Sequence, residues 1–173
     1  MAKFGFKEIN QQNWLEPDEA IKVFVKISPD GKPQSMSGED WLQPILTPKL
    51  LEAVPQDVQA LFEVARGALL YGYFFYPLYT LAAQQLFRLT EAAVSHKCKA
   101  LGAPNSKERF AEKIRWLANK GVIPETDIPA WDAVRKLRNS ASHPERQSII
   151  TPGMAIGLLE RVTEQINDLF NRA

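Results

Sequence analysis

The residues best suited to chemistry lie together in the string LRNSASHPER, residues 137–146. Arg138 and His143 are five positions apart, which corresponds to about 140° around an ideal α-helix. Asn139 and His143 are four positions apart and share a face if the helix continues that far. Because Pro144 disfavours helical geometry at His143, we expect the helix to loosen there. Arg138 and His143 meet only if the helix loosens in this way, or if each reaches its partner in another subunit.

An arginine, an amide and a histidine in one pocket are sufficient for RNA cleavage without a metal. A histidine titrates near neutrality, so it can remove the proton of a 2′-hydroxyl or protonate the leaving oxygen. An arginine can hold the scissile phosphate and stabilise its charge in the transition state. The basic residues Arg135, Lys136 and Arg138 also have a second interpretation, because cations at a helix C-terminus suit the helix dipole without any catalytic role.

The composition excludes several other kinds of site. The chain has a single cysteine, Cys98, which excludes a disulfide framework and a cysteine-based zinc site. His96 and Cys98 are two positions apart on a predicted helix and point in different directions, so they do not form a metal site. We therefore expect no metal and no cofactor. The net charge of +1 favours no class of partner.

The sequence also bears on localisation. The longest apolar stretch, residues 69–83, is too short to cross a bilayer and is interrupted by Gly72 and Pro77. The first ten residues, MAKFGFKEIN, contain neither an apolar segment nor a cleavage pattern, so we do not expect a signal peptide. These features predict a cytoplasmic protein without membrane attachment.

Residues 1–50 are predicted to form an irregular N-terminal extension. Alternating apolar residues in IKVFVKI, residues 21–27, indicate a strand. SPDG at 28–31 suits a type I turn, so a short β-hairpin is expected. Three prolines follow in residues 32–48, and we expect only a short helix near residues 39–43. The segment has too few apolar residues for a separate core.

Residues 51–173 are predicted to form one all-α domain, a bundle of about five main helices. Apolar residues recur at spacings of three and four, and proline and glycine mark the breaks. Asn105 and Glu108 have the spacing of a capping box, and Thr151 precedes a proline as an N-cap does. The expected helices cover residues 54–72, 77–101, 105–121, 127–142 and 151–171.

The apolar positions of these helices give a predicted core and one open question. The core is expected to contain Leu61, Phe62, Leu81, Leu86, Phe110, Ile114, Trp131, Val134, Leu137, Leu159, Val162 and Ile166. In the last helix, apolar residues follow spacings of 4, 3, 4 and 3, at Ala155, Leu159, Val162, Ile166 and Leu169. This pattern is typical of a coiled-coil seam between two chains, but packing within one bundle uses the same spacing.

The string RNSASH, residues 138–143, resembles the R-x4–6-H motif of the HEPN superfamily, in which a polar residue often follows the arginine. The order of the predicted helices is similar over residues 55–172, whereas residues 1–50 have no counterpart. The resemblance implies that Arg138 and His143 are the catalytic pair and Asn139 a polar accessory. It implies more loosely that Glu91, in RLTEAA, lies near the motif, although Glu91 could instead pair with Arg88 or Lys97 on the surface. Accessory or RNA-binding positions would be Arg135, Ser142 and Arg146.

The resemblance further implies a homodimer whose two motifs face one another across a cleft. Many HEPN proteins are metal-independent endoribonucleases of toxin–antitoxin, defence or RNA-processing systems. Others are inactive modules that bind RNA or a protein partner, such as an antitoxin. A third possibility is a plain helical interaction protein in which the motif arose by chance.

Overall fold

The computed structural model describes residues 5–104, 106–107, 109–141 and 149–171. The α-helices are α1 (Gly38–Leu46), α2 (Gln56–Tyr71), α3 (Leu78–Ala100), α4 (Phe110–Asn119), α5 (Ile128–Ala141) and α6 (Pro152–Asn171), and the strands are β1 (Val25–Ile27) and β2 (Pro33–Ser35). The fold is thus mostly helical, with a two-stranded hairpin near the N-terminus. This confirms the predicted all-α bundle with a short hairpin in its extension.

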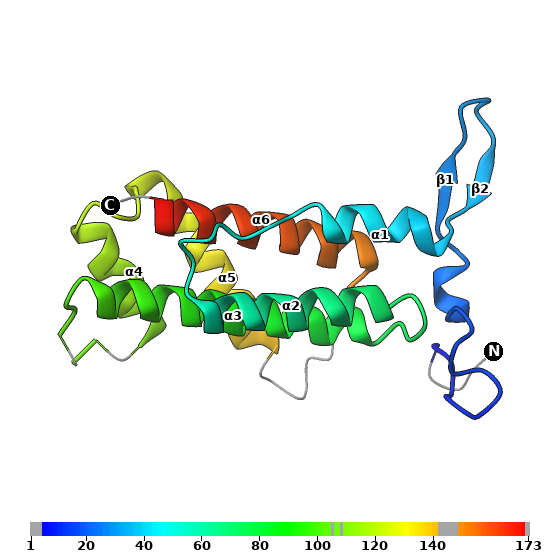
Figure 1. The fold of residues 1–173 in the computed structure, drawn as a ribbon, viewed down its shortest axis with the longest axis horizontal. Coiled ribbons are helices and arrows are strands. Elements are labelled where there is room, and N and C mark those ends of the chain that lie inside the picture. Colours follow the sequence, from blue (N-terminus) through cyan, green and yellow to red (C-terminus); the bar gives the residue numbers. More distant parts are fainter. Residues whose placement is uncertain (1–4, 105, 108, 142–148, 172–173) are drawn as a thin grey trace.

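α3 is the central helix of the bundle. It packs against α2, α4, α5 and α6, and α1 packs on α2 and α6. Figure 1 shows α2, α3 and α6 running along the long axis of the molecule, with the hairpin projecting from the end that carries α1. The linker between α1 and α2 follows α6, where the Asn167 amide donates to the Lys49 carbonyl and accepts from the Leu51 N–H, both at 2.9 Å.

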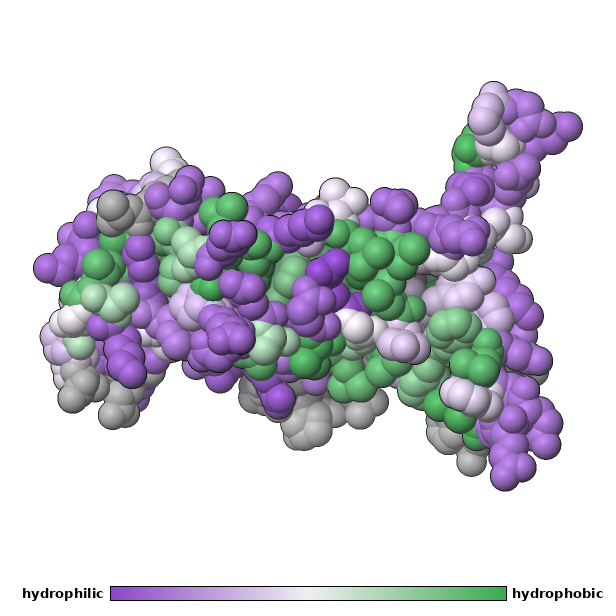
Figure 2. Space-filling view, in the orientation of Figure 1, coloured by the Kyte–Doolittle hydropathy of each residue, from purple (hydrophilic) through white to green (hydrophobic). Residues whose placement is uncertain are grey.

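The hairpin is shorter than the alternation of residues 21–27 predicts. β1 begins at Val25, because Ile21 belongs instead to a short 3-10 helix, Glu19–Ile21, and is buried in the main core. The predicted turn is present: the Gly31 N–H donates to the Ser28 carbonyl at 2.8 Å. Figure 2 shows a largely polar hairpin, with apolar side chains gathered over the end of the bundle beside the N-terminal extension.

The predicted start of the third bundle helix is wrong. α4 begins at Phe110, not at residue 105 or 106, and the Glu112 carboxylate accepts the Arg109 N–H at 3.3 Å at its start. The preceding residues form a turn in which the Lys107 N–H donates to the Pro104 carbonyl. Asn105 and Glu108, the predicted capping pair, lie outside the described residues.

Most of the predicted core is buried, but Leu81 and Leu137 are each 52% exposed and Leu61 is only partly buried. The inward face of α3 near its start is filled by Tyr79, Ala82 and Ala83, which leaves Leu81 between them on the outside. In α5 the buried apolar residues are Trp131 and Val134, whereas Leu137 and Arg138 in the next turn are both exposed.

The heptad-like positions of α6 pack within the chain. The five apolar residues of the repeat are all buried inside the same bundle: Ala155, Leu159, Val162, Ile166 and Leu169. The spacing therefore reflects intramolecular packing and gives no indication of a second subunit. No helix in the described ranges combines the length and apolarity that a bilayer span needs.

Candidate functional site

Arg138 lies in the last turn of α5 and contacts the middle of α3. Its Nη2 donates to Oε2 of Glu91 at 2.9 Å, across 47 positions of sequence. The Arg138 side chain is 44% exposed and that of Glu91 32%, so the pair lies at the surface. Of the two expectations for Glu91, the structure supports proximity to the motif, and the partner is Arg138 rather than Arg88 or Lys97.

The helices that carry this pair are fixed by their apolar faces. Phe87 and Val94, one turn to either side of Glu91 on α3, are buried, as is Val134 one turn before Arg138 on α5. α4 is tied to the same part of α3, because the Lys113 ammonium donates to the Ser95 hydroxyl at 2.9 Å. The position of Glu91 beside Arg138 therefore rests on the packed core beneath it.

Arg135, one turn before Arg138, is already engaged. Its Nε donates to Oδ1 of Asp132 at 2.6 Å, and Lys136 lies 3.1 Å from the other oxygen of the same carboxylate. Hydrogen bonds from Arg135 and then from Lys136 lower the pKa of Asp132 below its ordinary value. Asp132 thus stays ionised and holds two cations near Arg138 on the surface of α5.

The remaining motif residues are less fully placed. Asn139 lies in the final turn of α5, directly after Arg138. Ser142, His143 and Arg146 lie outside the described residues. The convergence of His143 with Arg138 therefore stays a prediction.

The chemistry available at the described part of this site is anion binding. A partly exposed guanidinium can form two parallel hydrogen bonds to a phosphate. At this site it can do so either with its remaining N–H groups while it stays paired with Glu91, or after its hydrogen bond to the Glu91 carboxylate breaks. Within the described ranges, no three histidine, cysteine, aspartate or glutamate side chains converge as metal ligands would. His96 pairs with Asp57 of α2, with 2.6 Å between Nε2 and Oδ2.

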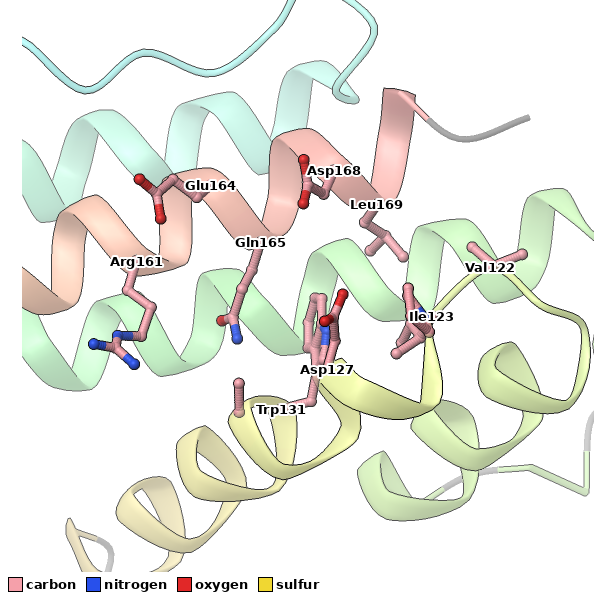
Figure 3. Close-up of a pocket in the computed structure, with 11 residues that line it drawn as sticks. Val122, Ile123, Asp127, Trp131, Arg161, Glu164, Gln165, Asp168 and Leu169 are labelled. Carbon is pink, nitrogen blue, oxygen red and sulfur yellow. The ribbon is translucent and has the colours of Figure 1, made fainter.

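A second candidate site, which sequence reasoning missed, lies between α6 and the start of α5. Arg161 and Gln165 of α6 and Asp127 and Trp131 line a pocket of about 200 Å³. Figure 3 shows the Arg161 and Gln165 side chains directed from α6 toward α5. The spacing of Arg161 and Gln165 places them on one helix face, but nothing in the sequence indicates which element covers that face.

Comparison with known proteins identifies the family to which the chain belongs. A family model described as a domain of unknown function, DUF4145, matches residues 69–172. Among curated proteins and solved structures, none matches the chain. The matched segment runs from the end of α2 to the end of α6, covers more than half of the chain and contains both Glu91 and Arg138. The chain therefore belongs to the DUF4145 family.

Proposed function

We propose that this protein is an HEPN-like, metal-independent endoribonuclease that acts as a homodimer. The observation that carries the proposal is the placement of Arg138. The motif arginine lies at the exposed end of α5, beside a carboxylate from the central helix, with a guanidinium that can reach a phosphate. The helix order of the bundle agrees with the one that the resemblance to HEPN proteins implies.

In the proposed reaction the 2′-hydroxyl oxygen of the RNA attacks the neighbouring phosphorus. The bond from phosphorus to the 5′ oxygen breaks, which yields a 2′,3′-cyclic phosphate and a 5′-hydroxyl. His143 removes the 2′ proton or protonates the leaving oxygen, and Arg138 stabilises the charge on the phosphate. Asn139 orients either group, while Arg135, Ser142 and Arg146 contact the strand nearby. We assign the activity to the cytoplasm, in a toxin–antitoxin, defence or RNA-processing role, with an antitoxin-like protein as a further partner.

The decisive experiment is incubation of mixed RNA with the purified protein in EDTA. We expect cleavage of RNA but not of DNA of the same sequence, because DNA lacks the attacking 2′-hydroxyl. The products should carry 2′,3′-cyclic phosphates, detected by mass spectrometry. A folded dimer that leaves diverse RNAs intact would reject the enzymatic proposal.

The dimer is expected to bring the two motifs together. Leu137, an exposed apolar residue, directly precedes Arg138. Two more exposed apolar residues, Leu81 and Ile149, lie close together, because the Ile150 N–H donates to the Thr80 hydroxyl. Light scattering should give twice the chain mass of 19.5 kDa. Leu137→Glu should shift the protein to monomer. The matched control, Val64→Glu at an exposed apolar position of α2, should leave the dimer intact, and a wild-type monomer at micromolar concentration would contradict the proposal.

The pairing of Arg138 with Glu91 favours a second candidate, an inactive HEPN-like module that binds RNA. A guanidinium already neutralised by a carboxylate binds phosphate less strongly, and Glu91 also repels the RNA backbone. Glu91→Gln should therefore tighten RNA binding by roughly two- to fivefold, as the loss of one surface charge pair allows.

Fluorescence anisotropy with a short single-stranded RNA measures this effect. The control is Glu160→Gln, which removes an exposed carboxylate from α6 and should change affinity much less. Weaker binding by Glu91→Gln would mean that Glu91 holds Arg138 in position rather than competing with the RNA.

A further inference from the structure

The pocket between α6 and the start of α5 has a polar group whose hydrogen-bonding capacity is unused. Both the amide nitrogen and the amide oxygen of Gln165 are buried, and neither has a hydrogen-bond partner in the part of the chain that the structure describes. Buried side-chain amides are almost always paired, because an unpaired one loses its hydrogen bonds to water without compensation. Figure 3 shows this amide directed from α6 into the gap above α5.

The charges at the pocket are arranged along its length. Arg161, one turn before Gln165 on α6, lies at one end and forms no ion pair with another described residue. Asp127 lies at the other end and accepts a hydrogen bond from the Thr126 hydroxyl at 3.1 Å. The row from Arg161 through Gln165 to Asp127 thus runs from a cation through a neutral amide to a carboxylate.

The floor of the pocket is apolar. Trp131 of α5, Ile123 and Leu169 line the pocket, and all three are almost wholly buried. Small-ligand sites commonly combine such an apolar floor with a few convergent polar groups. Two further carboxylates, Glu164 and Asp168, belong to the lining, which makes the pocket acidic overall and unfavourable for a ligand with several negative charges.

We propose that this pocket binds a short peptide with free termini. The peptide carboxylate pairs with Arg161, and the terminal ammonium lies toward Asp127. The N–H and C=O of the middle residue, which point to the same side of an extended chain, donate to the Gln165 amide oxygen and accept from its nitrogen. The negative terminus of such a zwitterion faces the cation of the pocket and its positive terminus faces the carboxylate. The peptide also supplies hydrogen-bond partners for both unpaired atoms of Gln165. This site is separate from the Arg138 motif, so it does not depend on the proposed ribonuclease activity.

The test uses the full chain labelled with ¹⁵N and trialanine with free termini as the probe. We expect saturable chemical-shift changes in the Gln165 side-chain amide and in the backbone amides of residues 127–131 and 161–165. Trialanine amidated at its C-terminus should bind roughly tenfold more weakly, because it loses a charge-assisted hydrogen bond to Arg161. N-acetylated trialanine should also bind more weakly.

Two variants separate binding from folding. Arg161→Gln should weaken the binding of trialanine by roughly tenfold and leave the melting temperature unchanged. Arg115→Gln, which removes an exposed arginine of α4, should leave trialanine binding unchanged. Gln165→Leu should abolish binding and raise the melting temperature of the free protein, since it removes an unpaired buried amide. The proposed peptide site is contradicted if trialanine gives no saturable chemical-shift changes at these residues, or if capping its termini does not change its affinity. It is also contradicted if adenosine monophosphate binds there and trialanine does not.

Discussion

His143→Ala is expected to reduce RNA cleavage by about 10²–10⁴-fold, the usual contribution of general acid–base catalysis. The initial rate of cleavage of a defined RNA in EDTA, measured at saturating enzyme, gives the loss directly. His96→Ala serves as the matched control, because His96 is the only other histidine in the chain and lies in a surface pair with Asp57.

Arg138→Ala should cause a comparable loss through missing phosphate stabilisation. Arg138→Lys should restore little activity, because an ammonium cannot reproduce the two parallel hydrogen bonds of a guanidinium. Since Arg138 pairs with Glu91 at the surface, its removal should change the free energy of unfolding by no more than about 1 kcal/mol. Urea unfolding of each variant checks this. Cleavage that survives both His143→Ala and Arg138→Ala would locate the activity elsewhere or attribute it to a contaminant.

The helix boundaries were predictable where a residue dictates them locally. Pro77 and Gly121 lie next to the helix ends at which the sequence places breaks, and Thr151 followed by Pro152 marks the start of α6. These signals act within one turn, so they do not depend on tertiary structure. The start of α4 was not predictable, because the spacing of Asn105 and Glu108 is as good a capping pattern as that of Arg109 and Glu112.

The sites depend on contacts between distant segments, and so sequence spacing describes them poorly. Arg138 and Glu91 lie 47 positions apart, and their pairing requires α3 and α5 to pack along particular faces. From its spacing Gln165 is an ordinary surface residue of α6, and only the packing of Trp131 and the other pocket residues against α6 buries its amide. The heptad-like spacing of α6 is compatible with two arrangements, and only the burial of Leu159 and its neighbours within the chain distinguishes them.

The N-terminal extension is joined to the bundle through a buried carboxylate, Asp18. Its Oδ2 accepts the Tyr76 N–H at 2.9 Å, and its Oδ1 accepts the N–H groups of Ala20 at 3.1 Å and Lys7 at 3.4 Å. The Asp18 N–H donates in turn to the Tyr73 carbonyl at 2.9 Å. Asp18 therefore links the extension directly to the turn between α2 and α3.

Asp18→Ala is expected to lower the free energy of unfolding by about 2–4 kcal/mol, because three N–H groups lose their acceptor in a buried environment. Asp18→Asn should cost less, since it keeps one side-chain oxygen as an acceptor. Urea unfolding measures the loss, and hydrogen exchange should show faster exchange at the Tyr76 and Lys7 amides. Asp30→Ala, in the exposed hairpin turn, is the matched control and should change stability by no more than about 0.5 kcal/mol. Equal effects of Asp18→Ala and Asp30→Ala would show that the extension is held to the bundle by apolar contacts, such as those of Ile21, and not by this carboxylate.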